Sequence, residues 1–121
     1  MVNIKGVLIP VDVDFTLVRP YTDTGLIGFE VIDPADETKT LLVEANEAMV
    51  RLVKEEFARG HLPLVWSRRG QRWAQIVVEA LRLVPYVAFT ADKPLAYFDD
   101  LDCNEWMKDR VFIPFETKYY K

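Results

Sequence analysis

Six polar residues stand beside apolar segments of this chain, and their types suit chemistry on a phosphate group. They are Asp12, Asp14, Ser67, Lys93, Asp99 and Asp100. Four carboxylates brought close together repel one another unless a cation lies among them. Oxygen ligands without His or Cys favour Mg²⁺ over Zn²⁺. The bound ion would neutralise phosphate charge, while Lys93 and the Ser67 hydroxyl could hold phosphoryl oxygens. The set therefore indicates phosphoryl transfer rather than acyl or hydride transfer.

These residues can meet only if the segments next to them form neighbouring strands. Apolar, β-branched runs predict buried strands over residues 7–13, 62–66, 86–89, 95–98 and 111–115. Apolar residues at helical spacing predict two helices, over residues 45–57 and 73–84. The alternation predicts an α/β fold, a Rossmann-like parallel sheet with helices on both faces. Ligands bind beyond the carboxyl ends of such strands, so the polar residues would converge at one edge. Lys93 precedes its predicted strand and would have to reach that edge.

A hairpin is expected directly after the first strand. Residues 26–32 and 38–43 read as two short strands, and Asp33-Pro34-Ala35-Asp36 between them has the composition of a turn. We expect the insertion 18–43 to form a small flap over the polar edge of the sheet. The whole chain, 1–121, has the length of a single domain.

Composition limits the classes of partner and the cellular compartment expected for this protein. The net charge of −4 argues against a general nucleic-acid or membrane binder. No apolar run approaches the roughly 20 residues that a membrane helix needs. Cys103 is the only cysteine, so no internal disulfide can form. With no signal peptide apparent, we expect a cytoplasmic protein without a membrane partner.

Four motifs in order resemble those of the haloacid-dehalogenase superfamily, over nearly the whole chain. An apolar strand is followed by Asp12-Val13-Asp14-Phe15-Thr16, as in the family's Asp-x-Asp-x-Thr motif. Ser67 ends the second strand, Lys93-Pro94 precedes the fourth, and Asp99-Asp100 ends it. One such motif would be weak, whereas the ordered set is specific. The family often has Gly where this chain has Phe15.

The resemblance implies a role for each motif residue. Asp12 would attack phosphorus and become an aspartyl-phosphate, and Asp14 would act as general acid and then as general base. Ser67 and Lys93 would orient the phosphoryl group, and Thr16 would brace the loop. The implied Mg²⁺ ligands are the carboxylate of Asp12, the backbone carbonyl of Asp14, and the carboxylate of either Asp99 or Asp100. An aspartate at position 14 is typical of phosphatases, and the short insertion is typical of members without a large cap.

Several of these residues also have simpler interpretations. Ser67 could be a helix N-cap, and Asp99-Asp100 could begin a turn. Arg68 and Arg69, with Arg72, could face a substrate beyond the transferred phosphate, but a solvated helix start fits them at least as well.

The sequence leaves rival functions and the substrate open. A catalytically silent domain, or a receiver-like phosphate-binding regulatory domain, is the alternative to a phosphatase. A receiver, however, has its acidic pair first and its Lys last. The substrate could be a phosphorylated small molecule or a nucleic-acid end. The flap or a homo-oligomer could cover the site.

Overall fold

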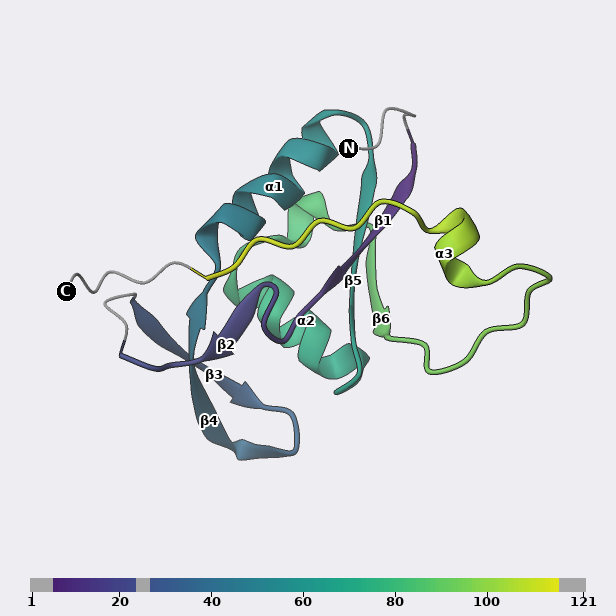
Figure 1. Ribbon diagram of the computed structural model, residues 1–121. Coiled ribbons are helices and arrows are strands. Elements are labelled where there is room, and N and C mark those ends of the chain that lie inside the picture. The colour runs from purple at the N-terminus through teal and green to yellow at the C-terminus, as the bar shows by residue number, and fades with distance from the viewer. Residues whose placement is uncertain (1–5, 24–26, 116–121) are drawn as a thin grey trace.

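A three-stranded parallel sheet carries the predicted site. The computed structural model describes residues 6–23 and 27–115 (Figure 1). The strands lie in the order β1 (Leu8–Asp12), β5 (Leu62–Ser67) and β6 (Phe89–Asp92). In the strand register, Asp12 is paired with Trp66, and Ser67 is paired with Asp92. The carboxyl ends of the three strands therefore meet at one edge, as expected for parallel strands.

A second, antiparallel sheet contains the predicted hairpin. Its order is β2 (Val18–Pro20), β4 (Asp36–Ala45) and β3 (Gly28–Asp33). The hairpin of β3 and β4 is confirmed, although residue 26 of its expected first strand lies outside the described residues. The strand β2 was not predicted, because three residues that include Pro20 give no periodic signal. The flap is thus a three-stranded sheet.

Two helices pack against these sheets. The first, α1 (Glu47–Ala58), begins after Asn46, whose side chain accepts a hydrogen bond from Met49 N over 3.3 Å. The second, α2 (Gln71–Ala80), packs on β5 and β6. Both match their predicted positions to within a few residues. No helix among the described residues is long and apolar enough to cross a membrane.

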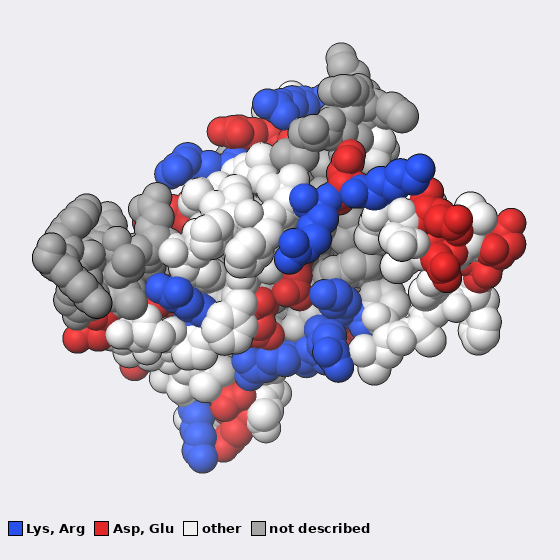
Figure 2. All heavy atoms as spheres, viewed as in Figure 1, with Lys and Arg blue, Asp and Glu red and all other residues white. Residues whose placement is uncertain are grey.

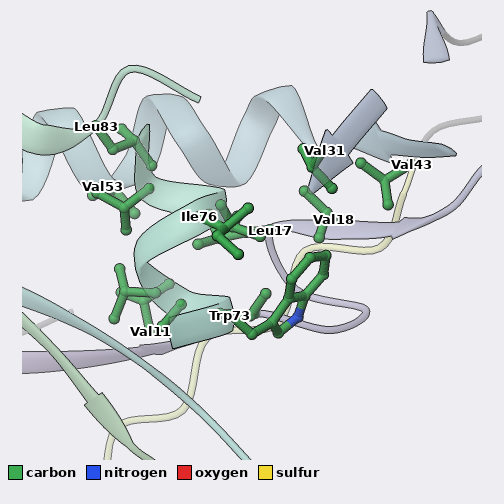
Figure 3. Close-up of a cluster of buried hydrophobic side chains, with 14 of the residues drawn as sticks. Val11, Leu17, Val18, Val31, Val43, Val53, Trp73, Ile76 and Leu83 are labelled. Carbon is green, nitrogen blue, oxygen red and sulfur yellow. The ribbon is translucent and has the colours of Figure 1, made fainter. Parts of the chain in front are cut away.

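One hydrophobic core joins both sheets and both helices. Figure 3 shows side chains of β1, the β1–β2 loop, the antiparallel sheet, α1 and α2 in a single cluster. The labelled members are Val11, Leu17, Val18, Val31, Val43, Val53, Trp73, Ile76 and Leu83. The antiparallel sheet is therefore packed onto the body of the protein by shared apolar burial, which drives such association.

The C-terminal third differs from the sequence-based expectation. The strand expected at 86–89 is replaced by the short 3₁₀ helix η1 (Val84–Tyr86), and β6 begins only at Phe89. Residues 95–98 and 111–115 form no strand. The helix α3 (Cys103–Trp106) lies between them. The two residues between β6 and position 95 cannot make a parallel crossover, which needs a dozen or more. The prediction of five parallel strands was therefore wrong, because the described sheet has three.

Candidate active site

The carboxylate of Asp12 has two polar neighbours at the edge of the parallel sheet. Lys93 Nζ lies 3.8 Å from Asp12 Oδ1, and Thr16 Oγ1 donates a hydrogen bond to Asp12 Oδ2 over 3.3 Å. The Asp12 and Lys93 side chains are 34% and 37% exposed. Lys93 follows β6, so its side chain spans β5 to meet Asp12 on β1. The structure thus brings together Asp12, Thr16 and Lys93, and leaves them open to solvent.

Asp14 is held by α2. Trp73 Nε1 donates a hydrogen bond to Asp14 Oδ1 over 3.2 Å, and Arg69 Nη1 lies 3.6 Å from the same oxygen. The guanidinium of Arg69 stacks over the Trp73 ring at 4.5 Å. Backbone hydrogen bonds from Leu17 N and from Val18 N to Val13 O close the turn that carries Asp14. One oxygen of its carboxylate is therefore bound by two neighbouring side chains, and the Asp14 side chain remains 31% exposed.

Ser67 organises the backbone where β5 ends. Its hydroxyl oxygen accepts a hydrogen bond from Arg69 N over 3.0 Å, and its carbonyl accepts one from Lys93 N over 2.9 Å. The residue is almost fully buried. It is not the N-cap of α2, because that position is taken by Gly70 at φ 109°. The left-handed conformation there favours glycine. Ser67 thereby places both Arg69 and Lys93 at the rim.

Two residues at this edge were missed from the sequence as functional. Asp92 Oδ1 accepts the first helical N–H of α2, from Gln71, over 2.6 Å. A carboxylate at a helix N-terminus is favoured by the helix dipole. Its position at the end of β6 was the available signal. Trp73 is the second, and no sequence signal indicates that its indole N–H reaches Asp14.

Asp99 and Asp100 lie apart from the other predicted metal ligands. Both are exposed, in the segment between β6 and α3. Leu101 N donates a hydrogen bond to Asp99 Oδ1 over 3.0 Å. This hydrogen bond, and then the neighbouring Asp100, lower the pKa of Asp99 from its ordinary value. The pair occupies a turn, because residues 95–98 do not extend the sheet.

Without Asp99 and Asp100, the predicted metal ligands provide only part of the coordination shell of an ion. Among residues 6–23 and 27–115, no three His, Cys, Asp or Glu side chains are grouped as a metal site requires. Asp12 and Asp14 do offer partly exposed carboxylates. Mg²⁺ commonly takes only one or two carboxylates and completes its shell with water and substrate phosphate. The Asp12 carboxylate, with the backbone carbonyl of Asp14, therefore fits a Mg²⁺ ion that shares its shell with water and a phosphate.

Basic side chains surround the two aspartates. Figure 2 shows Lys and Arg gathered beside acidic residues near the loop between β1 and β2. Arg72 pairs with Glu37 of the hairpin over 3.1 Å, which ties β4 to the first turn of α2. Arg68 is exposed and has no hydrogen bond, ion pair or ring contact with any other described residue. The rim thus has one cation that is not used inside the fold.

The geometry of the site is the basis for assigning a function, since comparison adds no relative. No protein-family model, no curated protein and no solved structure matches this chain.

Proposed function

We propose that this chain is a magnesium-dependent phosphohydrolase that acts on phosphomonoesters through an aspartyl-phosphate intermediate on Asp12. One observation carries the proposal: Lys93 and Thr16 converge on the Asp12 carboxylate, while Asp14 is oriented two residues further on. A nucleophile, a phosphate-binding cation and a second carboxylate at one open sheet edge suit phosphoryl transfer. The ordered motifs that resemble the haloacid-dehalogenase superfamily support the same assignment.

The residues divide the reaction between them. The Lys93–Asp12 distance of 3.8 Å is that of a loose, half-exposed ion pair. Such a pair is worth little, so an incoming phosphate can share the ammonium group. Asp12 attacks phosphorus, and the bond to the leaving oxygen breaks. Asp14, in its acid form, gives that oxygen a proton, and as carboxylate it then takes a proton from the attacking water. Trp73 and Arg69 orient Asp14 for both transfers.

Mg²⁺ would be held by the carboxylate of Asp12 and the backbone carbonyl of Asp14, and we propose that Asp99 or Asp100 joins them. When bound, the ion supplies the positive charge that lets an anionic nucleophile approach a phosphate. We also propose that the finer fold is the Rossmann-like parallel sheet with helices on both faces.

A phosphate-binding regulatory domain is the second candidate. The separation of Asp99-Asp100 from Asp12 favours it, since a domain that does not turn over needs a less complete site. Acetyl phosphate distinguishes the two. A phosphatase hydrolyses it repeatedly, whereas a receiver-like domain accumulates stoichiometric phosphoprotein that persists for minutes.

The direct test is a phosphatase assay on the purified chain with Mg²⁺ and with excess chelator. The substrates are p-nitrophenyl phosphate and a panel of nucleotides, sugar phosphates and phosphorylated oligonucleotides. We expect metal-dependent turnover that Asp12→Asn abolishes and that Asp109→Asn, at an exposed position, leaves unchanged. Full activity in chelator, or in Asp12→Asn, would refute the proposal.

A further inference from the structure

Phe15 occupies an unusual position in the turn that carries both aspartates. It lies between Asp14 and Thr16, and both of these neighbours take part in the polar contacts of the site. Its φ is 61°, in the left-handed region that L-residues with large side chains rarely adopt. Its side chain is 62% exposed. The turn thus imposes a positive φ on a residue whose large side chain makes that conformation costly, so the choice of Phe here is not explained by the backbone.

Packing does not explain the exposure of this ring. The same turn buries Val13 and Leu17 completely, whereas the ring of Phe15 is turned out of the core. Phe15 N donates to Val18 O over 2.7 Å, a backbone contact that any residue with an N–H could make. The fold therefore needs the backbone at position 15 and not the ring. A flat apolar surface is left at the rim, where a ligand could contact it.

The charge around the rim exceeds what a single phosphate requires. Lys93 and Arg69 face the two aspartates. Arg68, next to Ser67, is exposed and without a partner among the described residues. A free guanidinium suits a second anionic group, because Arg binds phosphate through two N–H donors. An aromatic platform together with an extra cation matches a ligand that has both an aromatic ring and further negative charge.

We propose that Phe15 and Arg68 select a nucleoside phosphate. The Phe15 ring stacks on the nucleobase, and Arg68 binds a phosphate other than the one transferred. This inference rests on the proposed function, and it names the substrate class of the same site. Free nucleotides and the ends of nucleic acids share this chemistry. Stacking on an aromatic side chain tolerates any base. The site would therefore require that the substrate has a base, but it would not distinguish one base from another.

The test compares a nucleoside 5′-monophosphate with ribose 5-phosphate, which has the same ester and sugar but no base. The ratio of their kcat/KM values is measured for the wild type, Phe15→Asn and Phe15→Trp. Asn accepts a positive φ, so the turn is retained without the ring. We expect the ratio to fall about tenfold or more in Phe15→Asn and to be preserved in Phe15→Trp. A ratio that changes less than about twofold in Phe15→Asn overturns the inference.

A binding experiment separates this inference from the proposed function. If no phosphomonoester is turned over, the phosphatase proposal fails, and calorimetric binding of the same two ligands still tests the role of the ring. Weaker nucleotide binding in Phe15→Asn, with ribose 5-phosphate unaffected, supports the inference. Equal binding of the nucleotide by Phe15→Asn and the wild type overturns it.

The second phosphate is tested with Arg68→Gln, and Arg51→Gln on the exposed surface of α1 is the matched control. We expect Arg68→Gln to lower kcat/KM several-fold more for a nucleoside diphosphate or a 5′-phosphorylated dinucleotide than for a nucleoside monophosphate. If the wild-type protein has the higher kcat/KM for the diphosphate, its ligand is a free nucleotide. If the dinucleotide is better, the ligand is the end of a nucleic acid. Equal losses on all three substrates would overturn the role of Arg68.

Discussion

Trp73 donates its indole N–H to Asp14 Oδ1 over 3.2 Å and so connects α2 to the loop after β1, across 59 residues of sequence. The same side chain is only 1% exposed and belongs to the hydrophobic core. Arg69, stacked on its ring, reaches the same carboxylate oxygen. A buried residue with a rigid ring thereby fixes a partly exposed carboxylate in one orientation. The core and the proposed acid–base residue are thus directly connected.

Replacing Trp73 with Phe should therefore affect stability and the site together. The change removes a hydrogen bond to a charged group and leaves a cavity, so we expect the free energy of unfolding to fall by about 1–3 kcal/mol. Urea denaturation measures this change. Trp106→Phe is the control, because Trp106 is about half exposed on α3 and its loss should cost less than about 0.5 kcal/mol. Equal effects of the two substitutions would contradict the structural role of Trp73.

The Asp12→Asn and Asp14→Asn variants should lose different steps of the reaction. Asp12→Asn removes the nucleophile, so no covalent intermediate should form. Asp14→Asn should still phosphorylate Asp12 with p-nitrophenyl phosphate, whose leaving group needs little protonation, and should then discharge it slowly. Rapid-mixing kinetics would show an early release of nitrophenol followed by a slow phase. For alkyl phosphates, the loss should be about 10²–10⁴-fold. A burst in Asp12→Asn but not in Asp14→Asn would reverse the two roles.

The Mg²⁺ dependence of the rate reports whether Asp99-Asp100 joins the site. If one of them is a metal ligand, its change to Asn should raise the Mg²⁺ concentration for half-maximal activity by about tenfold or more. Asp109→Asn, another exposed acidic position, should leave this concentration unchanged. If the Mg²⁺ dependence is unaltered in both single variants, neither residue is a metal ligand. Their role would then be local, as in the hydrogen bond that Asp99 accepts from Leu101 N.

The turn of the flap has a carboxylate whose titration can be followed. Thr38 donates its hydroxyl to Asp36 Oδ1 over 2.6 Å and its backbone N–H to the same atom over 3.1 Å. The hydroxyl, and then the N–H, lower the pKa of Asp36 below 3.8. The resulting stabilisation is present above the unfolded pKa and is lost as pH falls through the lower folded value.

Thr38→Val should move the pKa of Asp36 back towards 3.8, without reaching it, because the backbone N–H remains. Carboxyl-carbon NMR titration would measure the shift. Thr40→Val, two residues along β4, is the matched control and should leave the pKa where it is. A shift in Thr40→Val of the same size would mean that hairpin distortion, and not the hydroxyl, is responsible.

Local patterns in the sequence determined the first two thirds of the fold. The helix periodicity, the apolar runs before Asp12 and Ser67 and the turn at residues 33–36 all predicted elements that the structure contains. Parallel strands end at a common edge, and this rule predicted that Asp12 and Ser67 lie there. These features could be predicted because each depends on neighbouring residues or on one topological rule. Lys93 was expected to reach that edge from the loop before a strand, whereas in the structure it directly follows β6.

Only the tertiary structure decided the remaining features. Apolar runs as short as 95–98 and 111–115 look alike whether or not a sheet edge is free to pair with them, so the separation of Asp99-Asp100 from Asp12 could not be foreseen. The hydrogen bond from Trp73 to Asp14 and the capping of α2 by Asp92 join residues 59 and 21 positions apart. Such contacts depend on how helices and strands pack in three dimensions, and no sequence spacing encodes that packing.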